Sequence, residues 1–126
     1  RDVENGEVTL AIRFTHEKET IKLENIVSNV IQKLETIQNG MLEKATEFVS
    51  SHIYEAKNMD EMINIANTKE GFIKADWCGS LECEMKMKEI KGTKSRCIVE
   101  NAKPLTGKCV VCGNDAKHLV IWGQQY

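Results

Sequence analysis

The chain has 126 residues, of which 41% are hydrophobic and 29% charged, and its formal net charge at pH 7 is −2. This composition suits one ordinary globular domain or two small ones. No apolar run approaches the roughly 20 residues that a membrane-spanning helix needs, and the small net charge argues against a protein that coats nucleic acid by bulk electrostatics. Because the sequence starts at Arg1 and not at a methionine, we expect it to be a piece of a longer protein.

The charge is unevenly distributed along the chain. Residues 1–85 hold 9 basic and 16 acidic side chains, a net charge of −7, whereas residues 86–126 hold 8 basic and 3 acidic ones, a net charge of +5. The cationic C-terminal end is suited to face a phosphate backbone. A solvated lysine surface explains the same charge, and both interpretations stay open.

The first predicted element is a β-hairpin. Apolar and polar side chains alternate over residues 8–14, which is the period of a strand with one buried face. Residues 15–18 are polar and predict a turn, and residues 19–23 predict a returning strand. A hairpin alone is marginally stable in water, so these strands must pack against the following helix or against a sheet outside the chain.

A long helix is predicted next. Apolar residues recur at three- and four-residue steps from Leu23 to His52, which predicts a helix running to about Ala56 and a connecting segment over residues 23–57. Only Gly40 weakens it, by about 1 kcal/mol relative to Ala. At roughly 1.5 Å per residue the helix would span about 50 Å, so its apolar stripe should touch more than one partner. We favour core or inter-domain packing over a coiled-coil seam because the flanking charges are not systematically paired.

Residues 58–126 are predicted to form a smaller domain. In chain order its expected elements are a short helix at 59–66, a strand at 72–77, a helix ending at 91, and strands at 94–99 and 117–122. The overall fold class is therefore α+β. It consists of an N-terminal hairpin over residues 1–22, a long connecting helix, and a small α/β domain with a three-stranded sheet.

Four of the five cysteines form two close pairs. Four residues separate Cys78 from Cys83, two separate Cys109 from Cys112, and 25 residues lie between the pairs. Four thiolates at this spacing are typical of a tetrahedral zinc site, because the soft thiolate ligand suits Zn²⁺ and a short Cys-x-x-Cys turn directs backbone N–H groups at a sulfur. With all four positions filled by sulfur, no site is left for water, so the zinc would be structural.

Other uses of the thiols fit the sequence less well than a zinc site. A redox motif is expected at the start of a helix in a βαβ unit, whereas Cys109 follows a loop that contains Pro104 and Gly107. Disulfides are disfavoured because the number of cysteines is odd and no secretory signal precedes them. His118 is a minority alternative as a fourth ligand, and Cys97 is interpreted as a small core residue with a spare ligand as the minority option.

Several stretches of the chain resemble the C-terminal zinc-binding domain of prolyl-tRNA synthetase, the class II type of eukaryotes, archaea and some bacteria. They are GFIKADWCG at 71–79, ECE at 82–84, SRCI at 95–98, GKCVVCG at 107–113, and the ending AK…GQQY at 116–126. Residues 1–22 resemble the last strands of the same enzyme's anticodon-binding domain. The motifs occur in the expected order at compatible spacing and cover nearly the whole chain.

The resemblance implies a fragment of a proline–tRNA ligase. The parent enzyme would use ATP and Mg²⁺ to activate proline and transfer it to tRNA-Pro, through class II motifs that are absent from this sequence. The chain would therefore hold structural zinc, contain no catalytic residue and be inactive alone. Its implied partners are the catalytic and anticodon-binding domains of the same chain, tRNA-Pro, and a second copy in a cytoplasmic homodimer, with no membrane.

The resemblance also implies roles for a few further residues. In that family the terminal tyrosine and its carboxylate reach toward the active site, and Tyr126 matches this position. Lys94, Arg96 and Lys108 are candidates for contact with tRNA, although residues 99–101 depart from the family pattern of a proline and an aromatic residue. A free-standing zinc module that binds nucleic acid and a thiol redox protein remain alternative functions.

Overall fold

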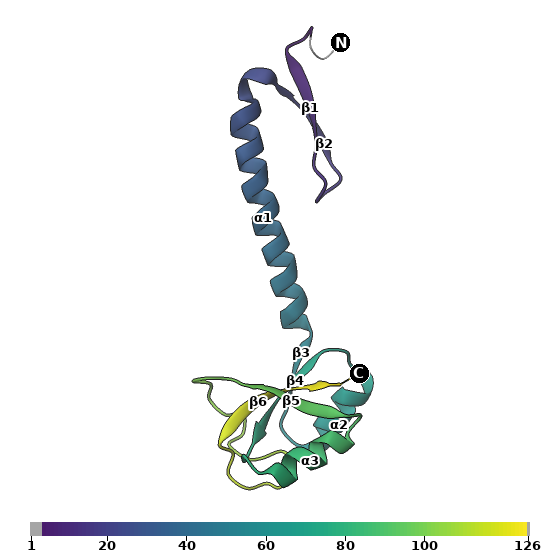
Figure 1. The fold of residues 1–126 in the computed structure, drawn as a ribbon, viewed down its shortest axis with the longest axis vertical. Coiled ribbons are helices and arrows are strands. Elements are labelled where there is room, and N and C mark those ends of the chain that lie inside the picture. The colour runs from purple at the N-terminus through teal and green to yellow at the C-terminus, as the bar shows by residue number, and fades with distance from the viewer. Residues whose placement is uncertain (1–3, 126) are drawn as a thin grey trace. The chain divides into compact units, whose positions relative to one another are not determined.

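The structure, a computed structural model, describes residues 4–125 (Figure 1). It divides into two compact units, with the division between Glu47 and Phe48 near the end of the long helix. The α+β class and the predicted order of hairpin, long helix and small sheet-containing domain are confirmed. None of the helices within residues 4–125 has the length and apolarity needed to cross a bilayer.

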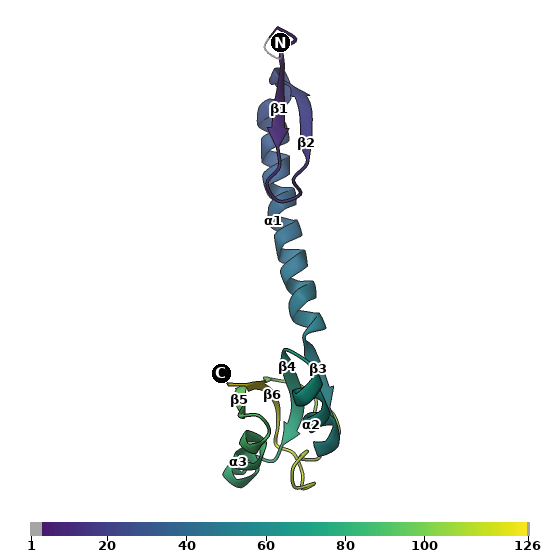
Figure 2. The ribbon, with the colours of Figure 1, turned by 90° about the vertical axis from the view of Figure 1, so that its right-hand side faces the viewer.

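The first unit contains a two-stranded antiparallel hairpin. Strand β1 (Glu7–Ala11) pairs with β2 (Lys18–Lys22). The first strand ends earlier than the alternation predicted, because the N–H of Ile12 donates to the carbonyl of Glu17 (2.8 Å) and closes the turn. Figures 1 and 2 both show the hairpin alongside the N-terminal half of the long helix.

The hairpin contacts helix α1 (Ile26–Ser51), which follows a 3-10 turn (Leu23–Asn25). The ring of Phe14 lies so close to Gly40 that a Cβ there would come within 2.8 Å of Phe14 Cε1. Lys33 Nζ forms an ion pair with Glu19 Oε2 at 2.8 Å. Gly40, which the sequence marked as a weak point of the helix, therefore provides room for an aromatic ring from the hairpin.

Most of the apolar stripe of α1 is exposed. No residue of the helix is buried. Its exposed large apolar side chains are Val27, Val30, Ile31, Leu34, Met41, Leu42, Phe48 and Val49. Packing of this stripe against a core or another domain therefore stays a prediction.

The helix ends at Ser51, and our prediction that it continues to about Ala56 was wrong. The side chain of His52 stacks on Phe48, with ring centroids 4.2 Å apart, and its Nδ1 lies 2.7 Å from the carbonyl oxygen of Phe48. The following residues form strand β3 (Ile53–Ala56), which pairs in parallel with β4 (Phe72–Trp77). Pairing with a distant strand outweighs the helical spacing, because Ile and Tyr suit a pleated, half-buried surface.

The second unit is built on a four-stranded sheet with the order β3-β4-β6-β5, and not on the three strands that we predicted. Its remaining elements are α2 (Met59–Thr68), α3 (Leu81–Glu89), β5 (Thr93–Ile98) and β6 (His118–Gln124). Strand β6 pairs antiparallel with both β4 and β5. The missed strand, β3, makes β3-α2-β4 a parallel crossover unit, so the sheet begins before residue 58.

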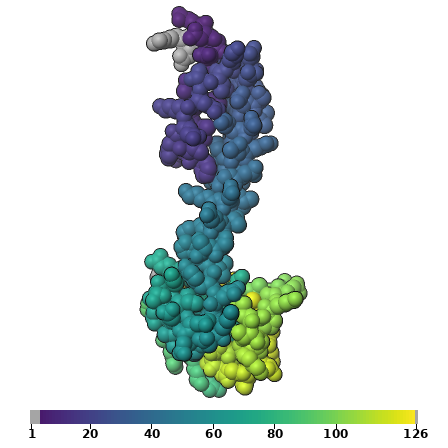
Figure 3. Space-filling model, turned by 180° about the vertical axis from the view of Figure 1, so that it is seen from behind, coloured from purple at the N-terminus to yellow at the C-terminus, as the bar shows by residue number. Residues whose placement is uncertain are grey.

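The core of this unit lies on one face of the sheet. Ile73 and Ala75 of β4 share that face with Val120 and Trp122 of β6, because alternate strand residues point the same way. Met62 and Ala66 of α2 and Met87 of α3 belong to the same buried cluster. Both helices therefore pack on this face. Figure 3 shows the teal atoms of the β3–α2 region lying against the yellow atoms of the C-terminal segment.

A predicted cap starts helix α2. The Oδ1 of Asn58 accepts a hydrogen bond from the N–H of Glu61 (2.9 Å), and Oε2 of Glu61 accepts one from the N–H of Lys57 (2.8 Å). This reciprocal pair satisfies two donors that a helix end leaves free. The break at residue 58 that the sequence indicated is confirmed.

We expect Gly71→Ala to destabilise the second unit by about 2–3 kcal/mol. Gly71 has φ +128°, and an added Cβ would overlap the carbonyl oxygen of His52, which accepts the N–H of Phe72 (2.8 Å). Chemical denaturation measures the change. Gly6→Ala is the matched control, because Gly6 also has a positive φ (+66°) but has open space around it. Equal losses for both variants would contradict the steric argument.

Candidate metal centre

The first cysteine pair lies where strand β4 gives way to helix α3. Cys78 directly follows β4, and Cys83 is buried in the first turn of α3. Between them Gly79 has φ +88°, and the ring N–H of Trp77 donates to the carbonyl oxygen of Ser80 (3.1 Å). This turn brings the Sγ atoms of Cys78 and Cys83 to 3.6 Å from each other.

The second pair lies in a tight turn between β5 and β6. The N–H of Gly113 donates to the carbonyl oxygen of Cys109 (2.9 Å). Gly113 has φ +72°, a conformation that glycine adopts without steric cost, so the chain reverses directly after Cys112. At the base of the turn Lys108 and Asp115 form a β-bridge and an ion pair with an Nζ–Oδ1 distance of 2.7 Å.

The fold brings the two pairs together. The sulfur atoms of Cys78, Cys83, Cys109 and Cys112 all lie within 4.8 Å of one another, and Sγ of Cys112 is 3.8 Å from Sγ of Cys78. In a tetrahedral zinc site with Zn–S bonds of about 2.3 Å, neighbouring sulfur atoms are about 3.8 Å apart. The donor set and its spacing therefore fit a zinc ion.

The arrangement does not match the other uses of the thiols. A disulfide requires an S–S distance of about 2.05 Å, and all five cysteines are free. Cys109 lies in a turn and not at the start of a helix, where a redox Cys-x-x-Cys motif is expected. His118, weighed as a fourth ligand, is not part of the four-sulfur group, and its ring faces Trp77 with centroids 6.0 Å apart.

Cys97 is exposed, so our prediction of a core position was wrong. It lies on β5, one of the two edge strands of the four-stranded sheet. The pairing of β5 with β6 shifts register between Ser95 and Cys97, which changes the face that the later residues present. An edge strand with a register shift cannot be recognised from the sequence of the strand alone.

The pKa values of the thiols differ within the cluster. Burial raises the pKa of Cys78, and burial together with the neighbouring thiols raises that of Cys83 to about 12. Burial also acts to raise the pKa of Cys109, but the backbone N–H groups of Cys112, Val111 and Cys78 outweigh it and lower the value to about 7. Metal binding to the thiolate forms must therefore release protons, above all from Cys83.

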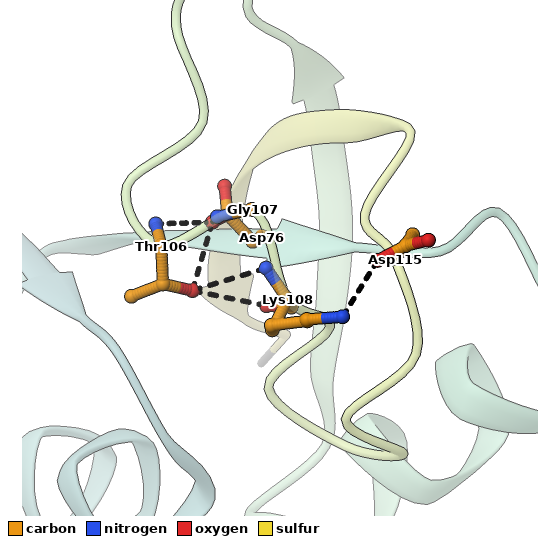
Figure 4. Close-up of polar contacts among 5 residues, drawn as sticks. All are labelled: Asp76, Thr106, Gly107, Lys108 and Asp115. Atoms are coloured by element: carbon orange, nitrogen blue, oxygen red, sulfur yellow. Dashed lines mark hydrogen bonds and ion pairs between the residues drawn. The ribbon is translucent and has the colours of Figure 1, made fainter.

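Asp76 is a site residue that the sequence reasoning missed. Its side chain is only 1% exposed, at the end of β4, two residues before the first cysteine. Its Oδ1 accepts the N–H of Leu105 (3.0 Å). Its Oδ2 accepts the N–H of Thr106 (2.7 Å), as Figure 4 shows, and the N–H of Gly107 (3.0 Å). The sequence contains one signal for a special role of Asp76, namely a carboxylate inside a mostly apolar strand. Its hydrogen-bond partners could not be read from the sequence, because they lie 29 to 31 residues later.

Arg96, a predicted tRNA contact, is engaged within the second unit. Its Nη2 donates to the carbonyl oxygens of Gly123 (3.3 Å) and Gln124 (2.6 Å) on β6. The amide of Gln124 in turn donates to the carbonyl oxygen of Ala66 at the end of α2. The guanidinium therefore contributes to holding the C-terminal strand in place.

Of the other predicted contact residues, Lys94 lies two residues before Arg96 on β5, and Lys108 lies on a different segment, between β5 and β6. Lys108 directly precedes Cys109, and its ion pair with Asp115 lowers the pKa of that carboxyl group. Lys94 is half-buried on β5. Tyr126, the predicted C-terminal anchor, lies outside the described residues.

Residues 59–126 match the family model described as "Prolyl-tRNA synthetase, C-terminal". Over 126 residues the chain is 44% identical to the proline–tRNA ligase of Clostridium novyi and 42% identical to proline–tRNA ligase 2 of Bacillus cereus. Each alignment covers 100% of this chain and 26% of the relative, so the chain spans about a quarter of the length of these proteins.

Solved structures agree with the sequence relatives. The crystal structure of prolyl-tRNA synthetase from Cryptosporidium parvum complexed with L-proline and AMP matches with a TM-score of 0.89 and 28% identity, over 100% of this chain and 27% of that chain. A structure of the same enzyme with halofuginone and AMPPNP matches with a TM-score of 0.88 and 29% identity, at the same coverage. Sequence and structure together show that this chain belongs to the prolyl-tRNA synthetase C-terminal family.

Proposed function

We propose that this chain supplies the C-terminal zinc-binding domain of a proline–tRNA ligase and that its zinc is structural. The observation that carries the proposal is the group of four sulfur atoms within 4.8 Å of one another, inside the residues that match the family. Cys78, Cys83, Cys109 and Cys112 would fill a tetrahedral coordination sphere, which leaves no place for a catalytic water. A bound zinc ion would join the end of β4, the start of α3 and the turn before β6, and so stabilise the fold.

The same proposal places the chemistry of the whole enzyme outside this chain. The relatives are named proline–tRNA ligases. The complete protein would use ATP and Mg²⁺ in its catalytic domain to join proline to tRNA-Pro, as a homodimer in the cytoplasm. This chain would stabilise that enzyme and would not itself react with substrate.

We also propose a division of labour along the chain. Residues 1–22 would complete the anticodon-binding domain, residues 23–57 would connect the domains, and residues 58–126 would form the zinc-binding domain. Strand β3 pairs with β4, so the sheet of the zinc-binding domain draws in residues 53–56 of the connecting segment. Tyr126, which lies outside the described residues, would act as a C-terminal anchor toward the active site of the whole enzyme.

Metal analysis of the purified chain tests the structural zinc. We expect one zinc per chain, a lower melting temperature after removal of the metal with a chelator, and protection of the cysteines from alkylation while zinc is bound. A chain that carries no metal and keeps its stability under chelator would contradict the proposal. Thiols that stay reactive in the metal-loaded protein would favour a redox function instead.

The net charge of +5 over residues 86–126 favours direct contact with tRNA as an added role. We expect Lys94→Glu to weaken tRNA-Pro binding and to reduce the slope of log affinity against log salt by about one. Arg96→Glu should weaken it too, but that change also removes the hydrogen bonds to Gly123 and Gln124 and is harder to interpret. Lys44→Glu, the same charge change on the exposed surface of α1, is the control. An unchanged salt titration for Lys94→Glu would make these lysines a solvated surface.

A further inference from the structure

We propose that Asp76 positions the second cysteine pair for metal binding, through the loop that leads into Cys109 and without itself contacting the metal. The inference rests on the proposed zinc site and deepens it. Asp76 is not among the four grouped ligands.

The first part of the argument is the convergence of loop donors on one carboxylate. Three successive backbone N–H groups, from Leu105, Thr106 and Gly107, point at the oxygens of Asp76 at 3.0, 2.7 and 3.0 Å. Successive N–H groups that converge in this way form a concave anion-binding site. Hydrogen bonds to an ionised acceptor are stronger than neutral ones, so the loop is held firmly to the end of β4.

The second part is that hydrogen bonds from Asp76, which together with the loop at 105–107 we call the clamp, reach both neighbours of Cys109. The hydroxyl of Thr106 lies 3.2 Å from Oδ2 of Asp76 and accepts the N–H of Lys108 (3.2 Å). The carbonyl oxygen of Asp76 accepts the N–H of Val110 (3.1 Å). Figure 4 shows the path from Asp76 through Thr106 to Lys108. The residues on either side of the ligand are thus fixed by Asp76, directly or through one hydroxyl.

The third part is the direction in which the side chains at the end of β4 point. Adjacent strand residues face opposite sides of a sheet. Asp76 holds the loop of the second cysteine pair, whereas Trp77 donates to Ser80 in the turn between Cys78 and Cys83. The end of β4 therefore makes hydrogen bonds to the segments that carry both cysteine pairs. The hydrogen bonds of the Asp76 carboxylate go to the loop at 105–107 and not to the helices of the core.

Asp76→Asn tests the inference in the full chain. The amide has nearly the same shape as the carboxylate, but its NH₂ group would face N–H donors, so the loop loses hydrogen bonds. We expect zinc affinity, measured by competition with a chromophoric chelator, to fall about 10- to 100-fold, the usual effect of losing an outer-shell partner. Zinc release to the chelator should accelerate accordingly.

Asp115→Asn is the matched control. It makes the same chemical change on an exposed carboxylate at the base of the turn that contains Cys109 and Cys112, where Asp115 is paired with Lys108. We expect it to bind zinc close to the wild-type affinity. A comparable loss for both variants would overturn the proposal, because the effect would then belong to charge near the site and not to the clamp.

A second pair of variants keeps the test independent of gross folding. Thr106→Val removes the hydroxyl and preserves the shape of the side chain, whereas Thr106→Ser keeps the hydroxyl. We expect the valine variant to bind zinc more weakly, as Asp76→Asn does, and the serine variant to keep close to the wild-type zinc affinity. Equal affinity for both would overturn the relay from Asp76 to Lys108.

Amide hydrogen exchange separates positioning from a general structural role. In zinc-saturated Asp76→Asn we expect faster exchange confined to residues 105–113, with β6 and α2 unchanged. Loss of protection throughout the second unit would show that Asp76 is only a core residue and would overturn the proposal, as would wild-type zinc affinity in Asp76→Asn. A wild-type chain that binds no zinc is a different result, because it overturns the proposed function and the role of Asp76 with it.

Discussion

Cys109→Ser is expected to release zinc and to unfold residues 72–126. Cys109 is only 3% exposed, and its thiol has a pKa lowered to about 7, which favours binding as thiolate. A serine hydroxyl does not ionise near neutral pH and is a poor zinc ligand. Binding of structural zinc contributes on the order of 10 kcal/mol to folding in small modules, which is comparable to the whole stability of a domain.

The loss should spread beyond the turn because the neighbouring residue belongs to the core. Val110 is 8% exposed, lies in the buried cluster with Trp122, and donates its N–H to the carbonyl oxygen of Asp76. Metal content and the thermal melt of the second unit measure the effect. Cys97→Ser is the matched control, since Cys97 is exposed and outside the four-sulfur group. Retention of one zinc per chain by Cys109→Ser, at the wild-type melting temperature, would contradict a four-thiolate site.

Trp122→Ala is expected to destabilise the second unit by about 3–5 kcal/mol. Trp122 is fully buried on β6, between β4 and β5, and is the largest of the fully buried side chains. Its ring meets Trp77 edge to face, with centroids 6.2 Å apart and an angle of 88°, and its Nε1 donates to the carbonyl oxygen of Ala75 (3.4 Å). Truncation would leave a cavity in the buried cluster to which Trp122 belongs.

Denaturant unfolding of the zinc-loaded chain measures this change. Leu81→Ala is the control, because Leu81 is 70% exposed at the start of α3 and should cost little. Trp122→Phe should lie between the two, because the smaller ring keeps part of the packing and loses the hydrogen bond. A loss below about 1 kcal/mol for Trp122→Ala would mean that the sheet and its helices pack elsewhere than on this face.

Local periodicity was sufficient to locate most helices and strands. It failed where pairing with a distant strand decided the secondary structure. The alternation in residues 8–14 located the hairpin, and the three- and four-residue spacing located α1. The predicted helix was extended over residues 53–56, but these residues form β3, because their backbone groups pair with β4 across an intervening helix. Periodicity describes which side chains share a face, whereas a parallel pair depends on a strand about 20 residues further on.

Burial of the α1 stripe shows the same limit. Its spacing indicates which residues would share a buried face, but a face is buried only if something covers it. Within residues 4–125 no residue of α1 is buried, and Leu34, for example, is 61% exposed. The sequence predicts which residues of α1 form the apolar stripe. Which surface buries that stripe depends on parts of the protein other than the hairpin.

By itself the sequence predicted a four-thiolate metal site, since ligand type and short spacing single out four cysteines in two pairs, and it was enough to recognise the family. Only the tertiary structure brought the four sulfur atoms together, added a fourth strand to the sheet and assigned partners to Asp76 and Arg96. Those partners lie 27 to 31 residues away along the chain. Thiolate coordination is a property of the residue and its near neighbours, whereas a buried carboxylate or a guanidinium takes its role from backbone groups that only folding brings within hydrogen-bond distance.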